Sequence, residues 1–219
     1  MAESFAVLVG GGSVTVEVDE PPGAGGDWLI CAHGAGGNRN DSGVLSLRDT
    51  FGARGLSVVR FDFLYKARGS GRPDPMPLLQ QTYAAVVDEI RSRFAPRRVF
   101  LSGRSMGGRT ATMLASAGYA CDGVVPIAYP LHPPKQPTKL RVDHLKEIAV
   151  PVLCFSGTRD EFCTPELMHA AVDALPGWTQ HWLEGADHFL HVLKRSGRTD
   201  AQVLAEVGDA TLGWIASHA

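Results

Sequence analysis

The chain has 219 residues, of which 44% are hydrophobic and 20% charged, and its formal net charge is −2 at pH 7. This length and composition are typical of one globular domain, so we predict a single domain over residues 1–219. The small net charge, with basic residues scattered along the chain, argues against nucleic acid as a partner.

The predicted elements begin with an antiparallel hairpin, because FAVLV (5–9) and SVTVEV (13–18) are joined by three glycines. From WLICA (28–32) onward, short apolar runs alternate with segments of helical periodicity. We predict further strands at 57–63, 98–103, 123–129, 151–157 and 179–185, and helices from Asp41 or Ser42 to Gly55 and at 78–95, 106–118, 165–176 and 200–218. This alternation indicates an α/β fold with a mainly parallel sheet and helices on both faces.

Two connections are longer than a turn requires: Leu64–Pro77 and Pro130–Arg141. Both follow strand ends, which is where open α/β sheets bind ligands. We expect at least one of them to border a site, although plain surface loops are the alternative. Neither is long enough to form a folded lid domain.

The N-terminal residues MAESFAVLVGGG lack the basic start and long apolar run of a secretory signal. No apolar run reaches the length of a membrane span. The four cysteines show no paired spacing of the kind that metal ligands have; they are Cys31, Cys121, Cys154 and Cys163. We therefore expect free thiols, a cytoplasmic location, and no membrane partner, metal or cofactor.

The segment GRSMG (103–107) matches the pattern G-x-S-x-G and lies between a predicted strand and a predicted helix. That context favours a sharp turn that exposes the hydroxyl of Ser105 above the sheet, with Gly103 and Gly107 avoiding collisions. The alternative is a tightly packed glycine turn in which the serine is incidental.

A serine nucleophile needs a base and an orienting carboxylate, in the chain order Ser, Asp or Glu, His. Asp160 follows one predicted strand and His188 follows the next, so both are expected at the same sheet edge as Ser105. Glu161 is the second candidate acid and His191 the second candidate base.

The segment CAHGAGGNRN (31–40) follows the strand WLICA and is rich in glycine. We predict that the backbone N–H groups of Ala35 and Met106 form an oxyanion hole, and that His33 holds the loop structurally. A phosphate-binding loop is the alternative, but the spacing of the usual phosphate-binding motifs is absent.

HG-x-GG, GRSMGG, GTRD and ADH occur in that order between about Trp28 and Leu190, and with them the chain resembles the α/β-hydrolase superfamily. It is most similar to small, lidless, dienelactone-hydrolase-like serine hydrolases. RFDF, YPLHPP and GTRDEF are also similar to the testis-expressed and KANL-type hydrolase-like proteins of animals. The resemblance implies that Ser105 is the nucleophile, Asp160 the acid and His188 the base. Dienelactone hydrolase itself uses cysteine as nucleophile, so serine here favours an esterase or thioesterase.

We therefore expect a serine hydrolase that cleaves an ester or thioester of a small to medium acyl group. The alternatives are a non-catalytic interaction module with this fold and a small peptidase or amidase. Arg104 and Arg109 flank the nucleophile, and lysines and arginines crowd both long loops. A positively charged entrance would favour acyl substrates with a carboxylate or phosphate; solvated loop cations are the other interpretation.

Overall fold

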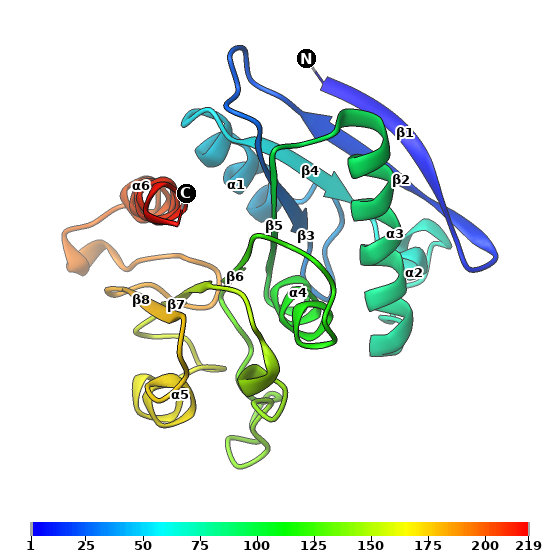
Figure 1. Ribbon diagram of the computed structural model, residues 1–219. Helices are drawn as coiled ribbons and strands as arrows, with labels where there is room; N and C mark the ends of the chain where they lie inside the picture. Colours follow the sequence, from blue (N-terminus) through cyan, green and yellow to red (C-terminus); the bar gives the residue numbers. More distant parts are fainter. Residues whose placement is uncertain (1, 219) are drawn as a thin grey trace.

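The computed structural model describes residues 2–218, and all eight of its strands form one sheet (Figure 1). The strand order is β1-β2-β4-β3-β5-β6-β7-β8. The strands are β1 (Ala2–Val9), β2 (Gly12–Asp19), β3 (Asp27–Ala32), β4 (Ser57–Phe61), β5 (Arg98–Arg104), β6 (Gly123–Ile127), β7 (Val152–Gly157) and β8 (Trp178–Leu183).

The helices are α1 (Ser42–Gly52), α2 (Leu64–Ala67), α3 (Met76–Phe94), α4 (Met106–Ser116), α5 (Pro165–Val172) and α6 (Asp200–Ser217), with short 3₁₀ turns η1 (Leu145–Glu147) and η2 (Lys194–Ser196). Within residues 2–218, no helix is long and apolar enough to cross a membrane.

The sheet is mostly parallel and starts with the predicted antiparallel hairpin. β1 pairs antiparallel with β2, and β2 pairs antiparallel with β4. Gly10 and Gly11 make the turn at φ of 39° and 92°, which glycine adopts without steric cost. All other strand pairs are parallel, so β3 to β8 end at one edge of the sheet.

Helices cover both faces of the sheet, as Figure 1 shows. Apolar residues of α3, α4 and α5 pack on one face, where Tyr83, Leu114 and Met168 join one continuous core with β-strand side chains. α1 and α6 cover the other face, with Phe51 and Val207 in a second core. Because β3 and β5 are buried on both faces, their central residues form the apolar runs WLICA and VFL in the sequence.

Several predicted boundaries were wrong, for local reasons. Residues 64–77 are not one loop, because α2 occupies its start and α3 begins at Met76, with Pro77 in a first turn that tolerates a missing N–H. The strand predicted over 57–63 stops at Phe61, since the N–H of Phe63 donates to the ring of His33 instead of a neighbouring strand. α5 ends at Val172, four residues before Pro176.

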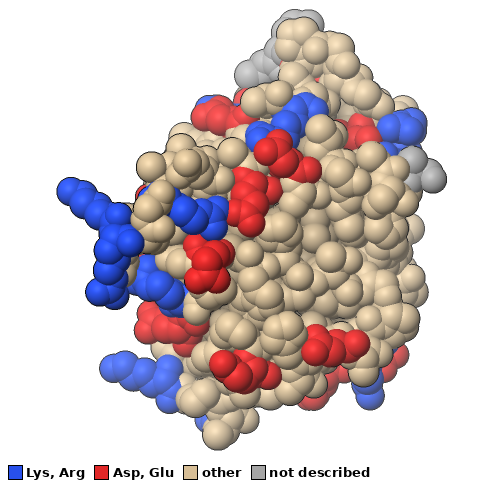
Figure 2. Space-filling model, turned by 90° about the vertical axis from the view of Figure 1, so that its left-hand side faces the viewer, with Lys and Arg blue, Asp and Glu red and all other residues tan. Residues whose placement is uncertain are grey.

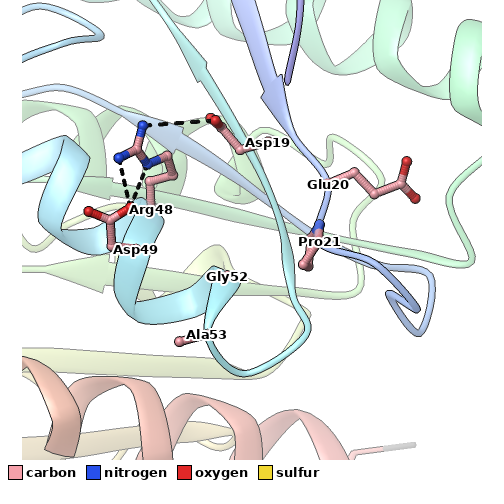
Figure 3. Close-up of a pocket in the computed structure, with 7 residues that line it drawn as sticks. All are labelled: Asp19, Glu20, Pro21, Arg48, Asp49, Gly52 and Ala53. Atoms are coloured by element: carbon pink, nitrogen blue, oxygen red, sulfur yellow. Dashed lines mark hydrogen bonds and ion pairs between the residues drawn. The ribbon is translucent and has the colours of Figure 1, made fainter. Parts of the chain in front are cut away.

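Charged residues on the face in Figure 2 are of both signs, with Lys and Arg gathered toward one side. An open pocket of about 340 Å³ lies where β2 ends and α1 finishes, at the edge opposite the carboxyl ends of the parallel strands. Arg48 there contacts both Asp19 and Asp49 (Figure 3). Because Arg48 is paired with these two carboxylates, we interpret this pocket as a structural feature of the surface.

Candidate active site

Ser105 lies on a sharp turn between β5 and α4. Its φ of 52° and ψ of −115° are strained for a residue with a side chain, and such strain is found mostly at functional positions. The turn requires glycine on both sides. A Cβ on Gly103 would lie 2.7 Å from the backbone of Gly107, and one on Gly107 would lie 2.3 Å from the carbonyl oxygen of Ala32. The two glycines let β3 and α4 approach the serine closely.

Three side chains from distant parts of the chain meet at this turn. Nε2 of His188 lies 2.9 Å from Oγ of Ser105, and Nδ1 of His188 lies 2.7 Å from Oδ2 of Asp160. A carboxylate can only accept, so Nδ1 carries the proton and Nε2 presents a lone pair to the serine hydroxyl. Asp160 and His188 are buried, which strengthens these hydrogen bonds.

Asp160 is fixed by the loop after β7. Its Oδ1 accepts a hydrogen bond of 2.8 Å from the N–H of Phe162, so Oδ2 remains directed at His188. The second candidates lie elsewhere: Glu161 is exposed, and Nδ1 of His191 pairs with Asp200. The structure therefore brings together Ser105, Asp160 and His188. Neither Glu161 nor His191 takes part in this hydrogen-bonded series.

The loop after β3 turns tightly beside the serine. The N–H groups of Gly36 and Gly37 both donate to the carbonyl of Gly34. The N–H groups of Ala35 and Met106 have no acceptor among residues 2–218, and both residues line a cavity that also contains Ser105. The predicted oxyanion-hole residues are thus adjacent to the nucleophile, with amides available to a ligand.

His33 holds this loop in place, as the sequence predicts. Its Nδ1–H donates to the carbonyl of Gly34 at 2.7 Å, which leaves Nε2 to accept the N–H of Phe63 at 3.2 Å. Burial lowers the pKa of the His33 ring, so the ring is neutral and has one donor and one acceptor. Both ring nitrogens of His33 form hydrogen bonds with the backbone, so the role of His33 is structural.

An ion-pair network ties the same loop to the sheet. The N–H of Arg39 donates to Asp62 at 2.8 Å, and its Nε donates to Glu17 at 2.8 Å. Arg60, buried in β4, binds Glu17 at 2.7 Å and donates to the carbonyl of Arg39 at 2.8 Å. Both carboxylate oxygens of Asp62, which follows β4, are thus engaged by Arg39, and Asp62 takes no part in the hydrogen bonds of Ser105 and His188.

Two cavities open on either side of Ser105 and share Ala35, Phe162 and His188. One, of about 400 Å³, extends toward α3 and the loop after β6; the other, of about 450 Å³, extends along the glycine loop toward Arg104 and Phe189. The ring of Phe162 stands edge-on to His188 with centroids 4.5 Å apart. Sequence reasoning missed both phenylalanines, although their position next to Asp160 and His188 is a usable signal.

The cations predicted to surround the entrance divide into two groups. Arg104 lies largely buried beside the second cavity, with its guanidinium 3.3 Å from the carbonyl of His188 and 5.1 Å from the centroid of the Phe189 ring. Burial lowers its pKa. Arg109 and Arg141 line the first cavity. The remaining loop cations line neither of the two cavities; they are Lys66, Arg68, Arg72, Lys135 and Lys139.

A strained serine at a strand–helix turn, hydrogen-bonded to a histidine and a carboxylate at the carboxyl edge of a parallel sheet, is the arrangement of an α/β hydrolase. A family model described as an alpha/beta hydrolase domain matches residues 26–216. The match covers most of the chain, so the protein belongs to this family.

Solved structures of several hydrolases share the fold. A serine hydrolase without lid from Xanthomonas campestris is 20% identical, with a TM-score of 0.78 over 97% of this chain and 94% of that one. Est1E from Butyrivibrio proteoclasticus, in a structure with ferulic acid bound, is 16% identical, with a TM-score of 0.81 over 97% and 99%. Dienelactone hydrolase from Anabaena variabilis is 19% identical, with a TM-score of 0.76 over 99% and 97%.

Proposed function

We propose that the protein is a serine hydrolase that cleaves an ester or thioester of a small to medium acyl group through an acyl-enzyme intermediate. The observation that carries this proposal is the continuous hydrogen-bonded series from Ser105 through His188 to Asp160, at the meeting point of two cavities. A serine hydroxyl is a weak nucleophile at neutral pH, and this series is what activates it.

In the proposed first step, Oγ of Ser105 attacks the substrate carbonyl carbon while Nε2 of His188 takes the hydroxyl proton. Asp160 stabilises the resulting imidazolium through its hydrogen bond to Nδ1. The tetrahedral oxyanion accepts hydrogen bonds from the N–H groups of Ala35 and Met106; one such donor is typically worth about 2.7–4 kcal/mol. His188 then gives its proton to the departing alcohol or thiol.

In the second step, water replaces the leaving group. His188 removes a proton from that water as its oxygen attacks the acyl carbon, and the bond to Oγ of Ser105 breaks as the proton returns to the serine. The products are the free acid and the regenerated enzyme. This cycle uses only side chains and backbone amides already in the site.

Two other features of the chain, and the ligand of a protein with a similar fold, bear on the proposal. Within residues 2–218, no group of three or more His, Cys, Asp or Glu side chains is arranged to hold a metal ion, so we expect chelators to leave hydrolysis unchanged. The four cysteines are free, which suits the reducing cytoplasm. Est1E, a protein of similar fold, was solved with ferulic acid bound, which supports a carboxylic acid or its ester as ligand.

The test combines covalent labelling with a substrate screen. A fluorophosphonate should add one label per chain, at Ser105 in the peptide map, and esters of graded acyl length should be hydrolysed. Ser105→Ala should abolish labelling and lower kcat by on the order of 10³-fold or more. A wild-type protein that neither labels nor turns over any ester would favour the non-catalytic module. Hydrolysis of peptides or amides alone would favour the peptidase.

A further inference from the structure

The first cavity contains cationic side chains beside the candidate nucleophile. Its lining includes Ser105 and His188 and also Arg109 and Arg141. Met76 belongs to the apolar part of the lining. A ligand that fills the cavity therefore contacts both apolar side chains and two arginine side chains.

In the described part of the chain, neither Arg109 nor Arg141 is paired with a carboxylate, although Nη1 of Arg141 donates to the carbonyl of Pro130 at 3.4 Å. Arg60 binds Glu17 and Arg98 binds Asp27, whereas Arg109 and Arg141 pair with no carboxylate among residues 2–218. Nε of Arg109 is buried without any hydrogen-bond partner. Because Nε is closed to solvent, a ligand in the cavity would be bound by the Nη groups of Arg109, for which no acceptor is present among residues 2–218. A guanidinium without a protein acceptor is available to bind an anionic ligand.

The two positive charges are close enough to affect each other. Burial, followed by repulsion from Arg109, lowers the pKa of Arg141. Burial and the charge of Arg109 also lower the pKa of His144 to about 4, so this ring adds no charge near neutral pH. The one carboxylate in the lining, Asp74, forms an ion pair with Arg68. The cavity therefore carries an excess of positive charge.

Arg109 also lies close to the candidate nucleophile along α4. It follows Ser105 by one helical turn, with its N–H donating to the serine carbonyl at 2.9 Å. Four residues of α-helix rise about 6 Å along the helix axis. Because this rise separates the backbones of Ser105 and Arg109, we expect several bonds between a group bound by Arg109 and the carbonyl that Ser105 attacks.

We propose that Arg109 and Arg141 bind a carboxylate carried by the substrate, so that the preferred substrates are esters or thioesters with a carboxylate separated from the scissile carbonyl by a short methylene chain. This inference rests on the proposed hydrolase function. The guanidinium fork matches a carboxylate in geometry and charge, and the apolar lining suits the methylenes.

The test uses two matched pairs of esters, in which a terminal carboxylate is replaced by a methyl group. Monoethyl glutarate and ethyl pentanoate differ on the acyl side; 4-propionyloxybutanoate and butyl propionate differ on the alcohol side. In at least one pair, kcat/KM for the anionic ester should be about 10-fold or more above that for the neutral ester, as expected for a charged hydrogen bond. Higher salt should reduce the ratio.

Variants assign this preference to the two arginines. Arg109→Gln and Arg141→Gln should each lower the anionic-to-neutral ratio by about 10-fold, and Arg109→Lys should retain part of it. Arg195→Gln is the matched control, because it removes the same charge from an exposed 3₁₀ turn outside both cavities, and it should leave the ratio unchanged.

The outcomes separate the two proposals. If the neutral esters are hydrolysed in a Ser105-dependent way without preference for either anionic ester, the carboxylate site is wrong and the hydrolase function stands. If no ester is hydrolysed, the hydrolase function fails, and calorimetry with glutarate tests the site directly. If the Ser105→Ala protein binds glutarate and the double variant Ser105→Ala/Arg109→Gln does not, the carboxylate site is supported. Absence of glutarate binding, or binding of inorganic phosphate alone, would overturn it.

Discussion

The hydroxyl of Tyr83 accepts a hydrogen bond of 2.9 Å from the N–H of Ser102, three residues before the candidate nucleophile. The same hydroxyl is within donor range of the carbonyl oxygens of Ser102, at 2.7 Å, and Ile30. Tyr83 belongs to α3, while Ser102 and Ile30 lie on β5 and β3. A helix side chain thus completes the hydrogen bonding of two strands directly beneath the turn at Ser105.

Removing this hydroxyl should destabilise the protein. Tyr83→Phe leaves the buried N–H of Ser102 without its acceptor, at a cost of about 1–3 kcal/mol in the free energy of unfolding. Tyr119→Phe is the control, because the hydroxyl of Tyr119 bonds Asp88 near the surface, and its loss should cost less than about 1 kcal/mol. Urea denaturation of the three proteins gives both values. Equal losses in the free energy of unfolding for the two variants would mean that the hydrogen bonds of Tyr83 to β3 and β5 add no more stability than a surface hydrogen bond.

The glycines around the nucleophile should be irreplaceable. Gly107→Ala places a Cβ 2.3 Å from the carbonyl oxygen of Ala32, a contact that only a backbone shift relieves. We expect a loss of about 3 kcal/mol or more in the free energy of unfolding, together with most of the esterase activity.

Gly213→Ala provides the contrast, because a Cβ at this position of α6 meets nothing within 4 Å. Lower backbone entropy in the unfolded chain should make this variant about 0.4–1 kcal/mol more stable. Thermal unfolding of wild type and both variants measures these changes in stability. A Gly107→Ala protein as stable as wild type would refute the close packing at the turn.

Asp160→Asn should reduce kcat on the order of 10³- to 10⁴-fold with little change in fold. An amide can donate to Nδ1 of His188, and the ring then carries its proton on Nε2, where it cannot accept one from Ser105. Glu161→Gln is the matched control, since this neighbouring carboxylate is exposed and outside the hydrogen-bonded series. The kcat of Glu161→Gln should stay within about twofold of the wild-type value, because exposed charges typically have small effects. A large loss in Glu161→Gln would reassign the acid.

Stability should depend on pH through His144. Burial and Arg109 lower its pKa from 6.5 to about 4, while Nε2 contacts the hydroxyl of Thr112 at 3.0 Å. Between these two pH values the unfolded chain binds more protons than the folded one, so the free energy of unfolding falls as pH drops from about 6.5 to about 4. The ring is only partly buried, so we expect about 1–2 kcal/mol from it after allowing for solvent screening.

His144→Gln should remove this contribution. Urea denaturation of wild type and variant at pH 7 and pH 5 isolates it from the carboxylates, which titrate similarly in both proteins. The loss of stability between the two pH values should be smaller in the variant. The same loss in both proteins would show that His144 is free to protonate in the folded state.

The sequence by itself determined the alternation of strands and helices, because burial on both faces of β3 and β5 forces unbroken apolar runs, and helices on the sheet need apolar residues at helical spacing. It also determined the turn at Ser105, since only glycine at Gly103 and Gly107 permits the approach of Ala32. Chain order and strand ends sufficed to select Asp160 and His188, because parallel strands bring their carboxyl ends to one edge.

Only the tertiary structure decided which side chains share a cavity. Arg109 is one of several cations near the nucleophile in the sequence, and nothing local distinguishes Arg141 from Lys139; packing turns two arginines into the cavity and leaves the lysine in solvent. The tautomer of His33 likewise depends on Gly34 beside it and Phe63, thirty residues away. Local patterns encode local conformation and burial, whereas contacts between distant residues depend on how the completed elements pack.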